Sequence, residues 1–172
     1  VPHRLPAEEL TSPRVQKDLP VSDTLARPTY KVFIERAPEI YAGLAALTKG
    51  VDAAGLDKGL TELVKLRASQ INGCAFCLKF HLSVARKAGV PQEKLDLLAA
   101  WRDARLFTAR EQAALAFAEA MTGLEAEAAS DAAWAALRAE FSEDEALYLT
   151  VTVASINAWN RIAIGLNFAP PA

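Results

Sequence analysis

The chain contains few cysteines and few glycines, and neither charge is in large excess. Two cysteines and eight glycines occur in 172 residues, and 19 basic residues nearly balance 21 acidic ones. Two cysteines are too few for a secreted scaffold that is held together by disulfides. A net charge of -2 provides no positive surface field, which argues against nucleic acid and anionic membranes as partners.

A long hydrophobic run is also missing. The longest stretch without a formal charge covers residues 146–160 and includes two asparagines. It is shorter than the roughly 20 apolar residues that span a bilayer, so we expect a buried helix there and no membrane partner. The N-terminus has no apolar core typical of a secretory signal, and we therefore expect a cytoplasmic location.

Prolines are concentrated near the N-terminus. Five of the nine prolines lie in the first 28 residues. Proline does not fit a helix interior and donates no hydrogen bond to a sheet, so residues 1–29 are predicted to form an extended, proline-rich arm. The remaining length suits one globular domain, which we place at residues 30–172.

Helical signals follow the arm. Apolar residues at helical spacing predict a helix over residues 56–71, and Asn72-Gly73 supplies the left-handed residue that ends it. We expect the next helix to run from Cys74 to Ala88, and Pro91 to occupy the first position of another helix. Period-two alternation of β-branched residues is absent from the sequence, which predicts a compact all-α, multi-helix domain of about six to eight helices.

Other helix boundaries are marked by residues that favour a first turn, a cap or a stop. These are Pro38, Gly50, Ser130 and two S/T-x-x-E capping boxes, Thr108 with Glu111 and Ser142 with Glu145. We expect Pro38 to begin a helix that Gly50 ends, and Ser130 to cap a later one. In a capping box each side chain accepts a hydrogen bond from the other residue's free backbone donor.

Three of the four cysteine and histidine residues fall within eight positions: Cys74, Cys77 and His81. On a helix they share one face, within an arc of about 60°. At a helix start, free backbone N–H groups and the helix dipole stabilise thiolates, and a Cys-x-x-Cys pair there can close into a disulfide. His81 lies one turn beyond Cys77, where it can accept a thiol proton.

An acid that orients His81 is the remaining requirement. Glu62 and Glu93 both lie near this window in the sequence. Glu62 belongs to the preceding helix, which turns back at Gly73 and can bring the carboxylate beside the imidazole. Glu93 is the second candidate.

These residues resemble those of the AhpD-like alkylhydroperoxidases within the carboxymuconolactone decarboxylase superfamily. The matching run extends from Glu62 through Cys74 and Cys77 to His81, with eleven, two and three residues between these positions. Residues 156–161, Ile-Asn-Ala-Trp-Asn-Arg, also look like a late helix of the shorter members. The resemblance covers most of the chain from about Tyr30 onward.

The resemblance implies a peroxidase that reduces hydroperoxides through a dithiol. It implies that Cys77 is oxidised to a sulfenic acid and that Cys74 resolves it and donates a proton. Glu62 and His81 are implied to form the proton relay, and the assembly to be a hexamer or trimer. From the residues alone, the order of the two cysteines stays open, because the first position is often better placed for the helix dipole.

Two features depart from the family's best-known member. Phe76 stands between the cysteines where that member has a histidine, and the motif lies before the middle of this chain. The partner proteins of that member are therefore not expected here. The decarboxylase branch normally lacks the Cys-x-x-Cys pair, so a non-redox enzyme acting on a small organic acid is the alternative prediction.

Other site types fit less well. The cluster offers only three cysteine and histidine ligands for zinc, and Leu78 stands where haem attachment requires histidine. No dinucleotide or phosphate-binding glycine motif is present, so we expect no bound cofactor or metal. The reductant must be external: a small dithiol, a lipoyl group or a thioredoxin-like protein.

Two polar residues of the apolar final helix need partners. Asn157 and Arg161 are predicted to pair with another helix or subunit, with a position beside the thiols as the alternative. The proline-rich arm and the apolar final helix also predict a homo-oligomer, because a second subunit would bury them in part.

Overall fold

The computed structural model describes residues 26–124 and 126–171, and in that part every regular element is helical. Eight helices have six or more residues: α1 (Tyr30–Arg36), α2 (Pro38–Ala53), α3 (Lys58–Asn72), α4 (Ala75–Lys87), α5 (Gln92–Leu97), α7 (Ala109–Gly123), α8 (Glu127–Glu140) and α9 (Glu143–Gly165). A 3-10 turn and the short α6 (Trp101–Ala104) lie between α5 and α7. The predicted all-α fold class is confirmed.

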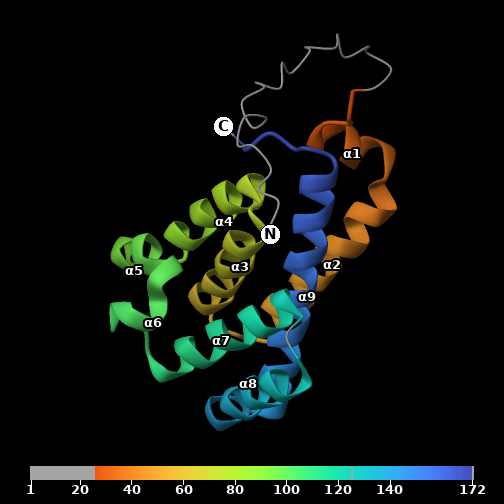
Figure 1. Cartoon of the computed structure of the whole chain (residues 1–172). Coiled ribbons are helices and arrows are strands. Elements are labelled where there is room, and N and C mark those ends of the chain that lie inside the picture. The colour runs from red at the N-terminus through yellow and green to blue at the C-terminus, as the bar shows by residue number, and fades with distance from the viewer. Residues whose placement is uncertain (1–25, 125, 172) are drawn as a thin grey trace, which may run out of the picture.

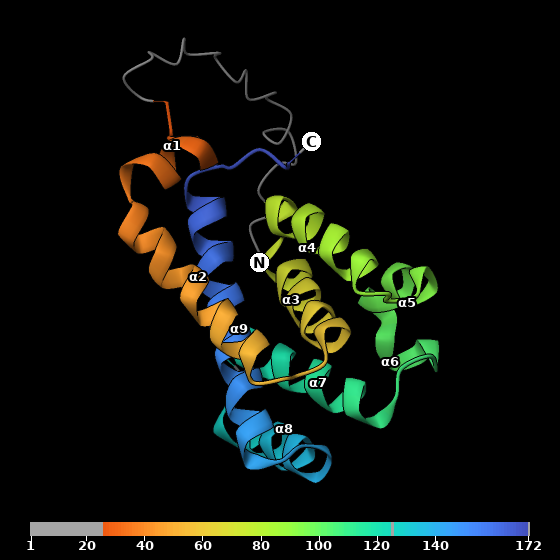
Figure 2. The ribbon, with the colours of Figure 1, turned by 180° about the vertical axis from the view of Figure 1, so that it is seen from behind.

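Helix α3 occupies the centre of the fold. It packs against α4, α7 and α9, while α2 lies along α9 and α8 along α7 (Figures 1 and 2). Nine of the 15 residues of α3 are buried, including the polar or charged Thr61, Glu62, Lys65 and Ser69. A central helix that carries buried charge must place that charge beside partners, and these partners form the site described below.

The apolar core consists of three neighbouring clusters. One joins α3 to α7, α8 and α9, and a second joins α3 to α4, α6 and α7. The third contains Cys74 and Cys77 with Ile156 and Ala163 of α9 and Phe168 beyond it. The cysteines therefore lie inside packed apolar side chains.

Several predicted boundaries are confirmed. Both capping boxes form, Pro38 stands at the start of α2, and Gly73 ends α3 in the left-handed conformation. The predicted arm lies mostly outside the described residues. Residues 26–29 are not helical, and α1 begins at Tyr30.

Four predicted boundaries are wrong. Gly50 does not end α2, because a helical glycine costs only about 1 kcal/mol and the next residue, Val51, is buried. Cys74 and Pro91 are the N-caps of α4 and α5, one position before their first turns. Ser130 lies inside α8, which begins at Glu127.

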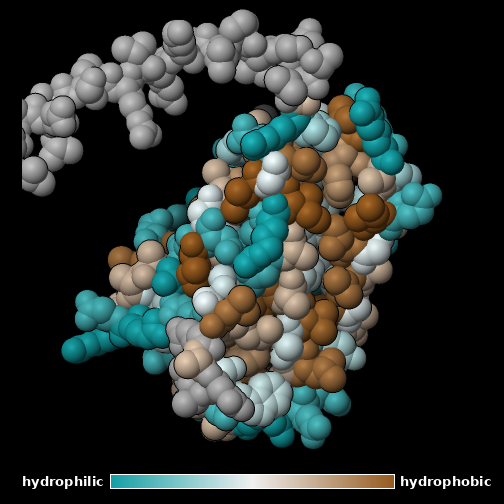
Figure 3. Space-filling model, turned by 45° about the vertical axis from the view of Figure 1, so that its right-hand side comes forward, coloured by the Kyte–Doolittle hydropathy of each residue, from teal (hydrophilic) through white to brown (hydrophobic). Residues whose placement is uncertain are grey.

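The long uncharged stretch forms most of α9 but is buried on one side only. Its buried residues include Leu149, Val153 and Ile156, whereas Leu147 is 54% exposed. Apolar surface gathers on the side formed by α1, α2 and α9 (Figure 3). No helix in the described residues is long and apolar enough to cross a membrane.

Candidate active site

The site is built on the hairpin of α3 and α4. Gly73 has a φ of 68°, a left-handed conformation that favours glycine, and the Cys74 backbone N–H donates to the Ser69 carbonyl at 3.0 Å. These features reverse the chain, so that α4 returns along α3. Glu62 near the start of α3 is thereby brought beside His81 in the middle of α4.

The two cysteines occupy the first turn of α4. Cys74 is the N-cap, and its Sγ accepts a hydrogen bond from the Cys77 backbone N–H at 3.3 Å. The two Sγ atoms are 2.7 Å apart and both thiols are free. With exposed fractions of 1% and 3%, both cysteines are shielded from solvent.

The two cysteines have pKa values that are shifted in opposite directions. A hydrogen bond from the Cys77 thiol lowers the pKa of Cys74 to about 7, against the opposing effect of burial. The Cys77 backbone N–H and the Asn160 side chain add to this lowering. The same thiol hydrogen bond, together with burial, raises the pKa of Cys77. The first proton to be lost therefore leaves its charge on Cys74.

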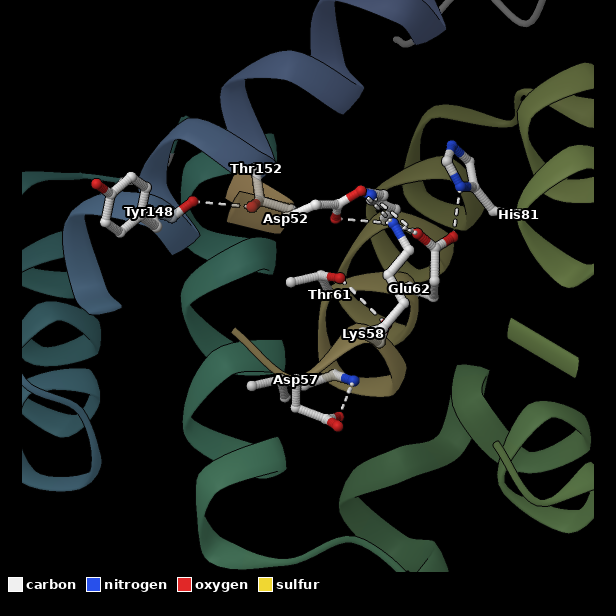
Figure 4. A network of polar contacts seen from close by, with 10 residues as sticks. Asp52, Asp57, Lys58, Thr61, Glu62, His81, Tyr148 and Thr152 are labelled. Carbon is white, nitrogen blue, oxygen red and sulfur yellow. Dashed lines mark hydrogen bonds and ion pairs between the residues drawn. The ribbon is translucent and has the colours of Figure 1, made fainter. Parts of the chain in front are cut away.

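Glu62 lies at the centre of a buried charge cluster. Its Oε2 is 2.6 Å from His81 Nδ1, and its Oε1 is 2.8 Å from Lys65 Nζ and 3.4 Å from Lys58 Nζ. Figure 4 shows contacts from His81 and Lys58 converging on the carboxylate. Burial alone raises the pKa of Glu62, but His81 and Lys65 outweigh it and lower the pKa to about 2. Glu62 is thus a carboxylate at neutral pH and fixes the His81 ring.

A cavity of about 340 Å³ adjoins these groups. Cys77, His81 and Glu62 line it, whereas Cys74 does not. Because the exposed Lys49 and Phe80 also line it, the cavity opens to solvent. A small molecule entering it meets Cys77 before Cys74.

A network of buried amides lies behind the thiols. Asn160 is fully buried; its amide nitrogen donates to Ser69 Oγ at 3.0 Å, and its oxygen accepts from Asn72 at 2.8 Å. Asn72 also donates to Asn157 at 2.8 Å. The predicted pairing of Asn157 with other helices is confirmed, since it also donates to Thr122 of α7.

Two further residues, Lys65 and Asn160, contribute to the site and were not among the predicted site residues. Lys65 is 5% exposed and pairs with Glu62, and the spacing of a lysine three residues after a glutamate on one helix could have predicted this pair. Asn160 faces the thiols, and the signal in the sequence was its place in the uncharged, mostly apolar stretch 146–160.

Two other residues lie away from the site. Glu93 is exposed on α5 and does not line the cavity. Arg161 is exposed and, among the described residues, donates along its own helix, to Asn157. The expected pairing with another helix is not seen there, and pairing with a second subunit stays a prediction. Among those residues, no three cysteine, histidine or acidic side chains converge as metal ligands.

The fold and site define a class of helical proteins in which a buried Glu–His pair adjoins a Cys-x-x-Cys dithiol. A sequence model of the Carboxymuconolactone decarboxylase family matches residues 38–120. Uncharacterized protein YdfG of Bacillus subtilis is 32% identical over 134 residues, which cover 78% of this chain and 91% of YdfG. The chain therefore belongs to the carboxymuconolactone decarboxylase family, as the motif predicted.

Solved structures support the same assignment. A protein of unknown function from Agrobacterium tumefaciens, described as a putative antioxidant defence protein AhpD, is 37% identical. It superposes with a TM-score of 0.76 over 81% of this chain and 96% of that one. The debrominase Bmp8 shares the fold with a TM-score of 0.71 at 21% identity, over 82% of this chain and 76% of that one. The AhpD-like resemblance is confirmed.

Proposed function

We propose that the protein is a thiol peroxidase that reduces organic hydroperoxides through Cys77 and Cys74. One observation carries this proposal: two free sulfurs 2.7 Å apart adjoin a cavity that His81 also lines. A buried carboxylate 2.6 Å from His81 holds the imidazole in place. A dithiol, a general base and a cavity open to solvent are the parts that peroxide reduction needs.

In the first step the Cys77 sulfur attacks the outer oxygen of the hydroperoxide. A sulfur–oxygen bond forms, the oxygen–oxygen bond breaks, and the leaving alkoxide takes a proton to become an alcohol. Cys77 is thereby oxidised by two electrons to a sulfenic acid, and the hydroperoxide is reduced by two electrons.

In the second step the Cys74 sulfur attacks Cys77. A disulfide forms and the hydroxyl of the sulfenic acid leaves as water after taking up a proton. An external dithiol then reduces this disulfide and is itself oxidised to a disulfide. The net reaction converts hydroperoxide and dithiol into alcohol, water and disulfide.

Position in the cavity supports the attacking role that we propose for Cys77. The lower pKa belongs to Cys74, at about 7, so at neutral pH the thiolate resides there while Cys77 keeps its proton. As Cys77 attacks, its proton passes to His81, and the Glu62 carboxylate stabilises the charged imidazolium that forms. His81 then supplies this proton to the leaving oxygen.

Counting thiols before and after one equivalent of hydroperoxide tests the proposal. We expect two thiols to become none, and mass spectrometry to show an intramolecular disulfide, with the chain lighter by two hydrogen atoms. Turnover should follow with a panel of reductants, namely a small dithiol, a lipoyl group and a thioredoxin-like protein. Thiols that stay free, or that form only intermolecular bridges, would contradict the proposal and favour the non-redox alternative.

Two matched variants test the order of the cysteines. Cys74→Ser should react once and leave a sulfenic acid on Cys77, which a dimedone-type reagent traps. Cys77→Ser should yield no trapped sulfenic acid on the first exposure to peroxide. The opposite result would assign the attack to Cys74.

A further inference from the structure

The cavity beside Cys77 has an apolar side. Five aromatic residues line it: Tyr30, Tyr41, Phe76, Phe80 and Trp159. Val84 and Ile156 add aliphatic surface. Its volume of about 340 Å³ lies within the range of small-molecule sites, about 300–1,000 Å³. These residues favour a ligand with an apolar body.

The same cavity carries an excess of positive charge. Lys49, Lys58 and Lys65 line it, and Glu62 is the only carboxylate among the lining residues. A ligand that enters such a cavity displaces water, and the ammonium groups then attract an anion more strongly than they would in bulk solvent. The charge therefore favours a ligand that is negative as well as apolar.

Two of the three lysines are already engaged. Lys65 Nζ is 2.8 Å from Glu62 Oε1. Lys58 Nζ is 2.9 Å from Asp52 Oδ1 and 3.4 Å from Glu62 Oε1. Lys49 of α2 makes no ion pair with any described residue, and its neighbour Thr48 also lines the cavity with a hydroxyl that can donate.

We infer that the cavity takes an organic anion, with the carboxylate at Lys49 and the apolar body along the aromatic residues. Resting on the proposed function, this names the substrate class as a hydroperoxide that also carries a carboxylate. Lys49 is then a specificity-determining residue. It holds the end of the substrate that does not react, and so leaves the peroxide free to approach Cys77.

A binding measurement that needs no redox chemistry tests the site directly. Calorimetry should show octanoate binding to the reduced wild-type protein and octanol binding at least several-fold more weakly. Lys49→Met should weaken octanoate binding by about tenfold, the scale of one partly shielded charge-assisted contact, and leave octanol unchanged. Lys87→Met is the matched control, because Lys87 is exposed on α4 and does not line the cavity. Equal binding of octanoate and octanol, or no effect of Lys49→Met, would overturn the inference.

A kinetic measurement separates this inference from the proposed function. A hydroperoxy fatty acid should be reduced with a lower KM than its methyl ester, and Lys49→Met should remove that difference while kcat is retained. If both peroxides are reduced alike, the peroxidase proposal stands and the anion site fails. If neither peroxide oxidises the thiols while octanoate binding still depends on Lys49, the anion site stands and the peroxidase proposal fails.

Discussion

Replacing Glu62 by glutamine removes one charge from the buried cluster and barely changes its shape. The carboxylate has Lys65 and His81 as partners, and its exposed fraction is 1%. Its pKa falls from 4.5 to about 2, which corresponds to roughly 3 kcal/mol in favour of the charged, folded form at about 1.4 kcal/mol per pKa unit. Glu62→Gln should therefore lower the free energy of unfolding by about 3 kcal/mol at neutral pH, since Lys65 loses its buried partner.

The pH dependence of this loss follows from the direction of the pKa shift. A carboxylate with a lowered pKa stabilises the fold fully above about 4.5, and that stabilisation disappears as the pH falls toward 2. Urea unfolding of wild type and Glu62→Gln should therefore differ at pH 7 and converge in acid. Near neutral pH the melting temperature should drop by about 6–12 °C.

Peroxide reduction should fall as well. Without the carboxylate, the His81 ring loses the partner that fixes its orientation and stabilises its charged form, so we expect kcat/KM to drop by about 100-fold. His81→Ala should be impaired to a similar extent, and the double variant little further, because the two residues act as one relay.

A second variant separates stability from catalysis. In Glu62→Gln/Lys65→Met the unpaired lysine is gone, so most of the lost stability should return while peroxide reduction stays low. The reasoning would be refuted if Glu62→Gln unfolded like wild type at pH 7, or if it kept full activity while His81→Ala did not.

Three further measurements test other parts of the structure. The rate of Cys74 alkylation should rise with pH around a midpoint near 7, and Cys77→Ala should move that midpoint upward, because it removes the thiol hydrogen bond. Gly73→Ala should destabilise the protein by about 1–2 kcal/mol, because its φ of 68° disfavours a side chain, whereas Gly43→Ala inside α2 should not. Light scattering should give a mass above 18.5 kDa, since α2 presents exposed apolar residues; a value of 18.5 kDa would rule out the predicted oligomer.

Local signals in the sequence were sufficient for most of the fold. Capping boxes, the Asn72-Gly73 stop and helical periodicity act over three to seven residues, so they can be read from neighbouring positions. The grouping of Cys74, Cys77 and His81 is equally local, because one turn of helix fixes their relative directions. The errors at Gly50 and Ser130 arose where packing of the surrounding helix outweighed the preference of a single residue.

The sequence favoured Glu62 over Glu93 as the partner of His81, and the contact itself depends on tertiary structure. Both glutamates are near the motif in the sequence, but the turn at Gly73 brings α4 back along α3, whereas Glu93 is exposed on α5. Only the folded hairpin places a carboxylate 2.6 Å from His81.

Tertiary structure also decided which residues that tune the site are buried and which of them meet across helices. Lys65 becomes a buried partner of Glu62 because α3 is surrounded by other helices. Asn160 reaches Ser69 across 91 positions of sequence, and no short-range pattern encodes a contact between helices that far apart. The sequence by itself determined which chemical groups the site contains. The packing of α2, α3, α4 and α9 decided which of these groups are charged and which cysteine lines the cavity. It also decided which lysine faces an incoming ligand.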